Sequence, residues 1–168
     1  MQRVTEDAQF ARGPEQSGFP LPVTTLAGFG ARLGASLIDA VILAVPMLVL
    51  LVVGRGPLAS GGLVQTVLGQ AMSIVYGGAL VAGYGRTVGM RALNIRVVPL
   101  DPSAELTSGQ AWLRAVAFNL PSVLPVVGVF WVFVDCLWML WDKPNSQTLH
   151  DKIARTVVVT TVPSLAAG

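Results

Sequence analysis

The chain has 168 residues, of which 53% are apolar and 12% are charged, whereas an ordinary soluble domain has roughly 25% charged residues. Nine acidic and eleven basic residues give a net charge of +2, without the clustered basic residues of a nucleic-acid-binding protein, so we expect no nucleic-acid partner. The single cysteine, Cys136, excludes an intramolecular disulfide and a thiolate metal site, and the length leaves room for one membrane domain.

The first 25 residues differ in composition from the rest of the chain. They carry five charged residues and three prolines, Pro14, Pro20 and Pro22, without a continuous apolar stretch for a signal peptide. We therefore predict a disordered cytoplasmic tail over residues 1–25, followed by a membrane domain over 26–160 and a short C-terminal tail over 161–168.

The first membrane span is predicted from Leu33 to Val53, where Asp39 is the single charged residue. Pro46 lies in its second half and is expected to kink the helix. Gly30 and Gly34 begin a ridge of small residues at the start of this span. Such ridges let neighbouring helices approach closely in lipid.

A second span is predicted from Leu63 to about Tyr84, after the polar turn GRGPLASGG. Gly69, Ser73 and Gly77 recur at every fourth residue and therefore form another ridge for helix packing. These ridges lead us to expect a homo-oligomer or a larger membrane complex.

The third apolar segment, Ala111 to Trp141, is too long for one untilted helix and carries Pro121 and Pro125 near its middle. Either its first part lies at the interface and one span follows, or it forms a bent or re-entrant pair of short helices that enters and leaves on the same side. A single last span would place the basic residues of the C-terminal segment outside. The positive-inside rule therefore favours an even number of crossings, with both termini cytoplasmic in the plasma membrane.

Two short segments have the composition of strands. They are ALNIRVV, which ends before Pro99, and TVVVTTV near the C-terminus. If both lie on the cytoplasmic side, they can pair as a small sheet that brings Arg91, Arg96, His150 and Asp151 together. The predicted fold class is therefore an all-α membrane protein, a bundle of three to four transmembrane helices with a short cytoplasmic β pairing.

An arginine and two aspartates stand out against this apolar background: Arg32, Asp39 and Asp151. They occur with the segments RLGASLID, GRTVGMRALNIRVV and LHDKIARTVVV. This ordered set, over about residues 26 to 160, resembles the RDD family of small prokaryotic membrane proteins, which is named for one arginine and two aspartates. The resemblance assigns the second aspartate to Asp151 and implies a membrane domain, with transport suggested for the family and cation–proton exchange proposed for some members.

Asp39 follows Arg32 by seven residues, which is two helical turns or about 10.5 Å along the axis. The two residues share a helix face but are too far apart for an easy direct pair. A carboxylate at this depth costs about 2.5 to 3.5 kcal/mol on insertion scales, so it requires a partner or a water-filled cavity. Asp39 is either a proton or cation site modulated by Arg32, or a structural residue bonded to Gln65, Gln70 or a backbone group of a neighbouring helix.

Asp135 is a further candidate at membrane depth, either as a second carboxylate or as the counter-ion of an arginine. The alternative is an interfacial position whose side chain reaches the aqueous phase. Asp151 is expected to cap a helix or to pair with Arg91 or Arg96. His150 is expected at the interface, where its titration adds pH sensitivity. The supporting polar residues are Arg91, Arg96, Gln147 and His150.

The chain has no zinc pattern, P-loop or dinucleotide fingerprint, and His150 has no nucleophile at a recognisable spacing. We therefore expect no enzymatic activity, metal or cofactor. The expected function is transport or exchange of a small cation or proton through intramembrane carboxylates. The alternative is a non-catalytic accessory or assembly subunit of a larger membrane complex.

Overall fold

A computed structural model describes residues 25–53, 62–143 and 145–161. The predicted disordered tail lies outside these residues apart from Thr25. The predicted C-terminal tail lies outside them apart from Thr161, and so does the polar turn before Gly62.

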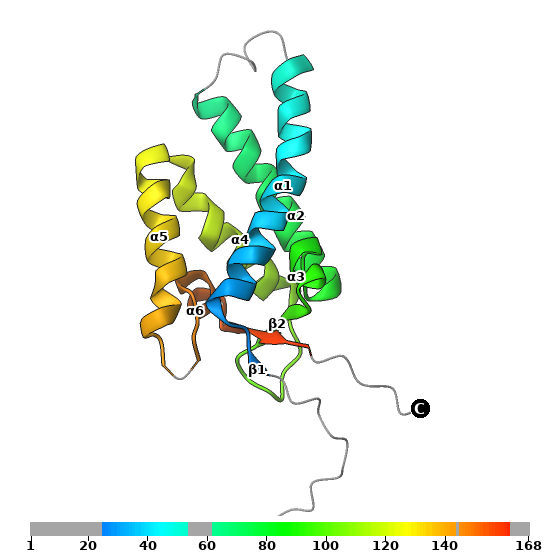
Figure 1. The fold of residues 1–168 in the computed structure, drawn as a ribbon, viewed down its shortest axis with the longest axis vertical. Coiled ribbons are helices and arrows are strands. Elements are labelled where there is room, and N and C mark those ends of the chain that lie inside the picture. Colours follow the sequence, from blue (N-terminus) through cyan, green and yellow to red (C-terminus); the bar gives the residue numbers. More distant parts are fainter. Residues whose placement is uncertain (1–24, 54–61, 144, 162–168) are drawn as a thin grey trace, which may run out of the picture.

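Two long apolar helices form one side of the molecule (Figure 1). They are α1 (Phe29–Val53), which continues through Pro46, and α2 (Leu63–Tyr84). Both are long and apolar enough to cross a membrane, and in their most apolar windows only 6% and 11% of the residues are buried. A core helix of a soluble protein would be largely buried, so this exposure favours contact with lipid.

The third apolar segment forms a helical hairpin. It consists of α4 (Ser108–Asn119), the short 3-10 helix η1 (Leu120–Val123) and α5 (Pro125–Trp141). Pro121 falls in η1 and Pro125 is the first residue of α5, where proline needs no backbone donor. The segment is therefore a bent pair of short helices. The first turn of α4 and the last turn of α5 lie toward the sheet (Figure 1).

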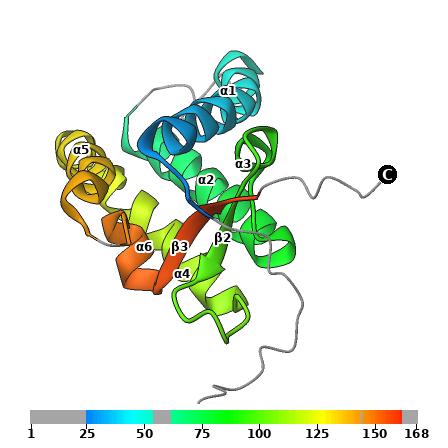
Figure 2. The same cartoon turned by 60° about the horizontal axis from the view of Figure 1, so that its bottom comes forward.

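A three-stranded antiparallel sheet closes one end of the helices (Figure 2). Its strands are β1 (Thr25–Leu26), β2 (Ile95–Pro99) and β3 (Thr156–Thr160), in the order β1-β3-β2. The predicted pairing of the two strand-like segments is confirmed, with Val97 opposite Val158. Ile95 and Val97 are buried and Arg96 between them is exposed, because alternate residues of a strand face opposite sides.

Two short helices connect the sheet to the long helices. They are α3 (Val88–Ala92) and α6 (Leu149–Ala154), and a threonine N-cap precedes each of them. Thr87 accepts a hydrogen bond from Met90 N and Thr148 accepts one from Asp151 N, which satisfies backbone donors of the first turn. The helix starts therefore fix where the neighbouring polar residues lie.

The predicted ridges of small residues serve helix packing only in part. A Cβ atom at Gly34 would lie 2.8 Å from Leu93, and one at Gly69 would lie 3.3 Å from Met47 of α1. A Cβ atom at Gly30 would have no described neighbour within 4 Å.

Closer helix approaches occur at glycines outside those ridges. A Cβ atom at Gly89 would lie 2.1 Å from the carbonyl oxygen of Ala35, and one at Gly78 would lie 2.4 Å from the ring of Trp112. Glycine at these positions therefore lets α3 pack directly against α1, and α4 against α2.

Candidate functional site

Asp151 lies at the centre of a buried cluster of charges. Its Oδ2 accepts a hydrogen bond from Arg32 Nη1 of α1 at 2.6 Å, and its Oδ1 accepts one from Arg114 Nε of α4 at 2.6 Å. The Asp151 side chain is fully buried. One carboxylate of α6 thus joins α1 and α4 at the end of the helices nearest the sheet.

Further hydrogen bonds to backbone carbonyls and to Thr156 hold the charged side chains of this cluster in place. Arg32 Nε donates to the carbonyl oxygen of Ala27 at 3.2 Å, and Arg32 Nη2 lies 3.5 Å from the carbonyl oxygen of Val158 in β3. Thr156 Oγ1 donates to Asp151 Oδ1 at 3.3 Å. The start of α1 is therefore bonded to the sheet through the same arginine that pairs with Asp151.

The charges around Asp151 determine its protonation. Burial on its own raises the pKa of the Asp151 carboxyl, but electrostatic interaction with Arg114, His150 and Arg32 outweighs burial and holds that pKa well below its ordinary value. Asp151 is therefore ionised at neutral pH and serves as the counter-ion of the arginines.

A second buried pair joins α5 to α6. Asp135 is fully buried, and its Oδ2 lies 2.6 Å from His150 Nδ1 while its Oδ1 accepts a hydrogen bond from His150 N at 2.8 Å. The interfacial alternative for Asp135 is therefore wrong. Among the described residues, the ionisable partner of Asp135 is His150 and not an arginine.

His150 itself is buried and not interfacial, with an exposed fraction of 8%. Its ring packs edge-on against Phe118 of α4, with ring centroids 5.2 Å apart. Its Nε2 lies 3.7 Å from Asp151 Oδ1. The histidine therefore lies between the two buried carboxylates.

Asp39 lies between three elements and is bonded by three donors. Its Oδ1 accepts hydrogen bonds from Tyr76 Oη of α2 at 2.7 Å and from Gly89 N of α3 at 2.7 Å. Its Oδ2 accepts one from Thr87 Oγ1 at 2.5 Å. Of the partners considered from sequence, the backbone group of a neighbouring helix is found, whereas Gln65 and Gln70 do not bond to Asp39.

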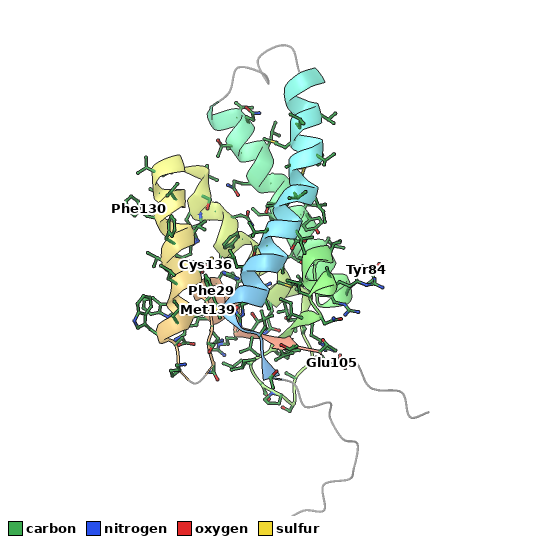
Figure 3. The ribbon with its side chains drawn as sticks, in the orientation of Figure 1. Phe29, Tyr84, Glu105, Phe130, Cys136 and Met139 are labelled. Atoms are coloured by element: carbon green, nitrogen blue, oxygen red, sulfur yellow. The ribbon has the colours of Figure 1, made fainter. Side chains whose placement is uncertain are left out.

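A cavity of about 440 Å³ lies between α1, α2, α4 and α5. Its wall includes Asp39 and the side chains that surround Asp151. The ionisable side chains that line it are Arg32, Asp39, Tyr76, Arg114 and His150. Phe29 of α1 and Cys136 and Met139 of α5, labelled in Figure 3, are among its apolar lining. Ser73 and Gly77 line it too, so part of the predicted α2 ridge leaves space for a cavity instead of packing against a helix.

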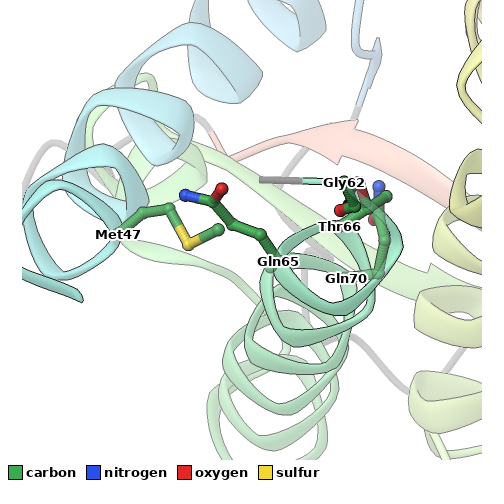
Figure 4. A pocket seen from close by; sticks show the side chains of 6 residues that line it. Met47, Gly62, Gln65, Thr66 and Gln70 are labelled. Atoms are coloured by element: carbon green, nitrogen blue, oxygen red, sulfur yellow. Dashed lines mark hydrogen bonds between the residues drawn. The ribbon is translucent and has the colours of Figure 1, made fainter. Parts of the chain in front are cut away.

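A smaller pocket of about 290 Å³ lies at the opposite end of α2 (Figure 4). Its lining consists of Met47 of α1 and polar or small residues from Gly62 to Gln70. None of these residues carries an ionisable side chain, so this pocket lacks the charge chemistry of the larger cavity.

The remaining predicted supporting residues lie apart from the cluster. Arg91 and Arg96 are exposed and form no ion pair with an acidic side chain among the described residues. The expected pairing of Asp151 with them is therefore wrong. Gln147 is buried and donates from Nε2 to the carbonyl oxygen of Thr156 at 2.8 Å, so it fixes the loop before α6.

Sequence reasoning did not identify Arg114, Tyr76, Thr87 or Gly89 as site residues. Arg114 was not singled out, although an arginine within the apolar stretch AWLRAVAF requires a partner. Tyr76 and Thr87 carry no sequence signal of their own, since hydroxyl side chains are common in membrane helices and at helix starts.

Comparison with known proteins places these contacts in a wider context. The model of the RDD family matches residues 26–155. A relative described as "Uncharacterized protein YckC" of Bacillus subtilis (strain 168) is 30% identical over 140 residues, which is 82% of this chain and 86% of that relative. No solved structure matches the chain.

Proposed function

We propose that this chain, which belongs to the RDD family, exchanges a small cation for a proton across the plasma membrane. The observation that carries this proposal is the cavity of about 440 Å³ among apolar helices with Arg32, Asp39, Arg114 and His150 on its wall. Ionisable side chains are costly inside a membrane and are found mainly along ion or proton pathways. The apolar exposed helices support the membrane setting of this cavity.

The cation site is assigned to Asp39 with the hydroxyl groups of Tyr76 and Thr87. Both hydroxyls donate to the carboxylate, but a hydroxyl oxygen also accepts, so rotation of the two hydrogens presents lone pairs toward a cation. The two carboxylate oxygens and two hydroxyl oxygens then form an oxygen set of the kind that hard cations prefer. Tyr76 and Thr87 line the cavity, which gives the cation a route to this set.

The proton site is assigned to His150 and Asp135. Histidine is the side chain whose charge ordinarily changes between pH 5 and 8. His150 lines the cavity and is bonded to the buried Asp135 at 2.6 Å, so a proton that enters the cavity has a partner that stabilises the charged ring. A cation at Asp39 and a proton at His150 both add positive charge to one cavity, which disfavours their simultaneous binding.

The orientation follows from the basic residues near the sheet. Six of them lie in or beside the short elements at this end: Arg86, Arg91, Arg96, Lys143, Lys152 and Arg155. Basic residues are enriched on the cytoplasmic side. We therefore assign the sheet and both termini to the cytoplasm, with an even number of crossings.

The test is cation-dependent proton movement in proteoliposomes that contain only this protein. A pH gradient is imposed, Na⁺, K⁺ or Li⁺ is added outside, and a trapped pH indicator reports the proton flux. Wild type is expected to respond to at least one cation, and Asp39→Asn is expected to abolish the response.

Tyr76→Phe removes one oxygen of the site and is expected to raise the cation concentration for half-maximal flux. Tyr84→Phe is the matched control, because Tyr84 is exposed at the end of α2.

Two results would overturn the transport proposal. One is full flux from Asp39→Asn, which would remove the carboxylate from the mechanism. The other is no flux from folded wild type with any cation, which would favour the accessory-subunit alternative. In that case Gly30, beside open space on α1, would be examined as a contact with a partner helix, in a homo-oligomer or a larger complex.

A further inference from the structure

The large cavity is polar at one end and apolar at the other. Arg32, Arg114 and His150 lie toward the sheet, while Leu43 and Val132 line the part toward the other end of the helices. From Arg32 to Leu43, the wall formed by α1 extends about 16 Å. The volume of the cavity, about 440 Å³, falls within the range of roughly 300 to 1,000 Å³ that is found for ligand pockets.

The apolar part of this cavity needs an apolar occupant. Protein interiors are close-packed, and water is retained in a cavity only where it finds two to four polar partners. Ser73 and Asn119 are the polar side chains of the lining near Leu43. Asn119 Nδ2 already donates to the carbonyl oxygen of Ala115, so few partners remain for water. A hydrocarbon chain would fill this part of the cavity without leaving polar groups unpaired.

The charged end has hydrogen-bond donors to spare. Asp151 is shared by two guanidinium groups, and Asp135, the second buried carboxylate nearby, is bonded to His150 and not to either arginine. Arg114 donates from Nε to Asp151, and its Nη1 and Nη2 atoms form no hydrogen bond with the described residues. Arg114 lines the cavity, and a guanidinium group matches the oxygens of a phosphate.

The cavity opens between α1 and α5. Leu33 and Leu37 line it and are 46% and 59% exposed, respectively, so its wall continues onto the outer face of α1. In the described part of the chain, α1 packs mainly against α3 and lies apart from α5. This opening therefore faces the surface that the apolar helices present to lipid.

We propose that the cavity binds an anionic phospholipid of the surrounding bilayer, with its phosphate at Arg114 and one acyl chain along α1 toward Leu43. The position of the charges fits this orientation, because Arg114 lies toward the sheet end and the apolar lining lies toward the membrane interior. Asp39, the other charge on the wall, is bonded by its three donors and lies about 10.5 Å along α1 from Arg32. The route proposed above for the cation runs through the same cavity, so a bound lipid and a cation at Asp39 would compete for it; lipid binding is measured without an ion gradient.

The test is native mass spectrometry of the delipidated full chain in detergent, titrated with dioleoyl phosphatidylglycerol. Dioleoylglycerol, which has the same chains without the phosphate, and glycerol phosphate, which has no chains, separate the two parts of the ligand. Wild type is expected to bind one phosphatidylglycerol at least about tenfold more tightly than either. Arg114→Gln is expected to remove the preference for the phosphate.

Two glycine substitutions locate the acyl chain without changing the charge cluster. Gly77 lines the cavity, whereas Gly83 on the same helix does not, and a Cβ atom meets no described neighbour at either position. Gly77→Leu is expected to weaken phosphatidylglycerol binding at least about tenfold, and Gly83→Leu is expected to leave it unchanged. Ser73→Leu fills the same cavity and replaces Gly77→Leu if that variant does not fold.

The proposal is overturned if dioleoylglycerol binds as tightly as phosphatidylglycerol, or if Gly77→Leu and Gly83→Leu bind equally. Binding of glycerol phosphate alone at the same affinity would also overturn it, because the acyl chain would then contribute nothing. A stable dimer that excludes lipid from wild type would assign the opening to a second copy of the chain and contradict a lipid site.

Discussion

Asp39 is half-buried and has no basic side chain as a hydrogen-bond partner in the described structure, unlike the fully buried Asp135 and Asp151. Two hydroxyl groups and one backbone N–H stabilise it instead. Hydrogen bonds to a charged acceptor contribute about 1.5 to 3 kcal/mol each to stability when the acceptor remains ionised. Asp39 therefore joins α1 to α2 and α3 in the same geometry that makes it the proposed cation site.

Asp39→Asn is expected to lower the free energy of unfolding by about 1.5 to 3 kcal/mol, because the amide replaces a charged acceptor and brings a donor toward donors. Chemical unfolding in detergent measures this change. Ser36→Ala is the control, since Ser36 Oγ bonds only to the carbonyl oxygen of Arg32 one turn earlier in the same helix. Equal stabilities of Asp39→Asn and wild type would show that the three hydrogen bonds stabilise the fold no more with a carboxylate than with an amide.

Asp151 gives the fold a pH dependence with a definite sign. The pKa of its carboxyl is lowered in the folded state from an ordinary value of 3.8. As the pH falls, the unfolded chain therefore takes up a proton first. The stabilisation by Asp151 is complete above that ordinary value and is lost as the pH falls through the folded-state pKa.

Asp151→Asn is expected to cost about 3 kcal/mol at pH 7, because it leaves two arginines beside a neutral group. This difference from wild type should shrink as the pH falls from 5 to 3. Unfolding curves across that range measure it, with Asp142→Asn as the control. The pKa of Asp142 is lowered too, first by its hydrogen bond with Lys152, but this pair lies near the surface. A cost that does not change with pH would contradict the assignment.

The individual residues of the site were only partly predictable from sequence. Asp39 and Asp135 were recognisable because a carboxylate in an apolar stretch requires a partner. Their partners were not recognisable, because His150 is fifteen residues from Asp135 and Thr87 is forty-eight residues from Asp39. Only the packing of α5 on α6, and of α1 on α3, brings these groups together.

Helix packing at the element scale depends on the contact between α1 and α3. Gly89 lies against the backbone of Ala35 and donates its N–H to Asp39. A side chain at this position would separate the two helices and lengthen that hydrogen bond. The contact thus couples a packing requirement to the geometry of the proposed cation site.

Gly89→Ala is expected to destabilise the protein by about 3 kcal/mol, since the added methyl group would overlap the carbonyl of Ala35. Gly83→Ala, in α2, is the control and should be neutral or slightly stabilising, because its methyl group meets open space and alanine favours a helix. Thermal unfolding of both variants in the same detergent gives the comparison. If the two melt together, α3 does not pack against α1 as described.

The elements themselves were largely predictable. Long apolar runs predicted α1 and α2, and the prolines at 121 and 125 correctly indicated a bend. β2 and β3 followed from runs of β-branched residues. Strand β1 was missed, because Thr25 and Leu26 are too few to produce a periodic pattern. The packing role of Gly78 and Gly89 was also missed, because a glycine's neighbours depend on the tertiary fold.

At the scale of the whole molecule, the charged and apolar parts are separated along the helices. The sheet and the short helices α3 and α6 lie at one end (Figure 1), and Asp151 belongs to α6. Most of the exposed large apolar residues lie on α1, α2 and α5. The membrane class followed from composition alone. The separation of charged and apolar parts along the helices did not follow from composition, because it requires the hairpin formed by α4 and α5 to bring β3 back to β2.

Both proposals depend on this arrangement relative to the membrane, and labelling of single cysteines with a membrane-impermeant maleimide tests it most directly. In a Cys136→Ser background, cysteines are placed at Ser60, between α1 and α2, at Glu105, before α4, and at Ile153 in α6. A cytoplasmic sheet predicts that Ser60→Cys reacts from outside intact cells, whereas Glu105→Cys and Ile153→Cys react only after permeabilisation. If Ile153→Cys reacted from outside while Glu105→Cys stayed protected, β2 and β3 would lie on opposite faces, and the account would be contradicted.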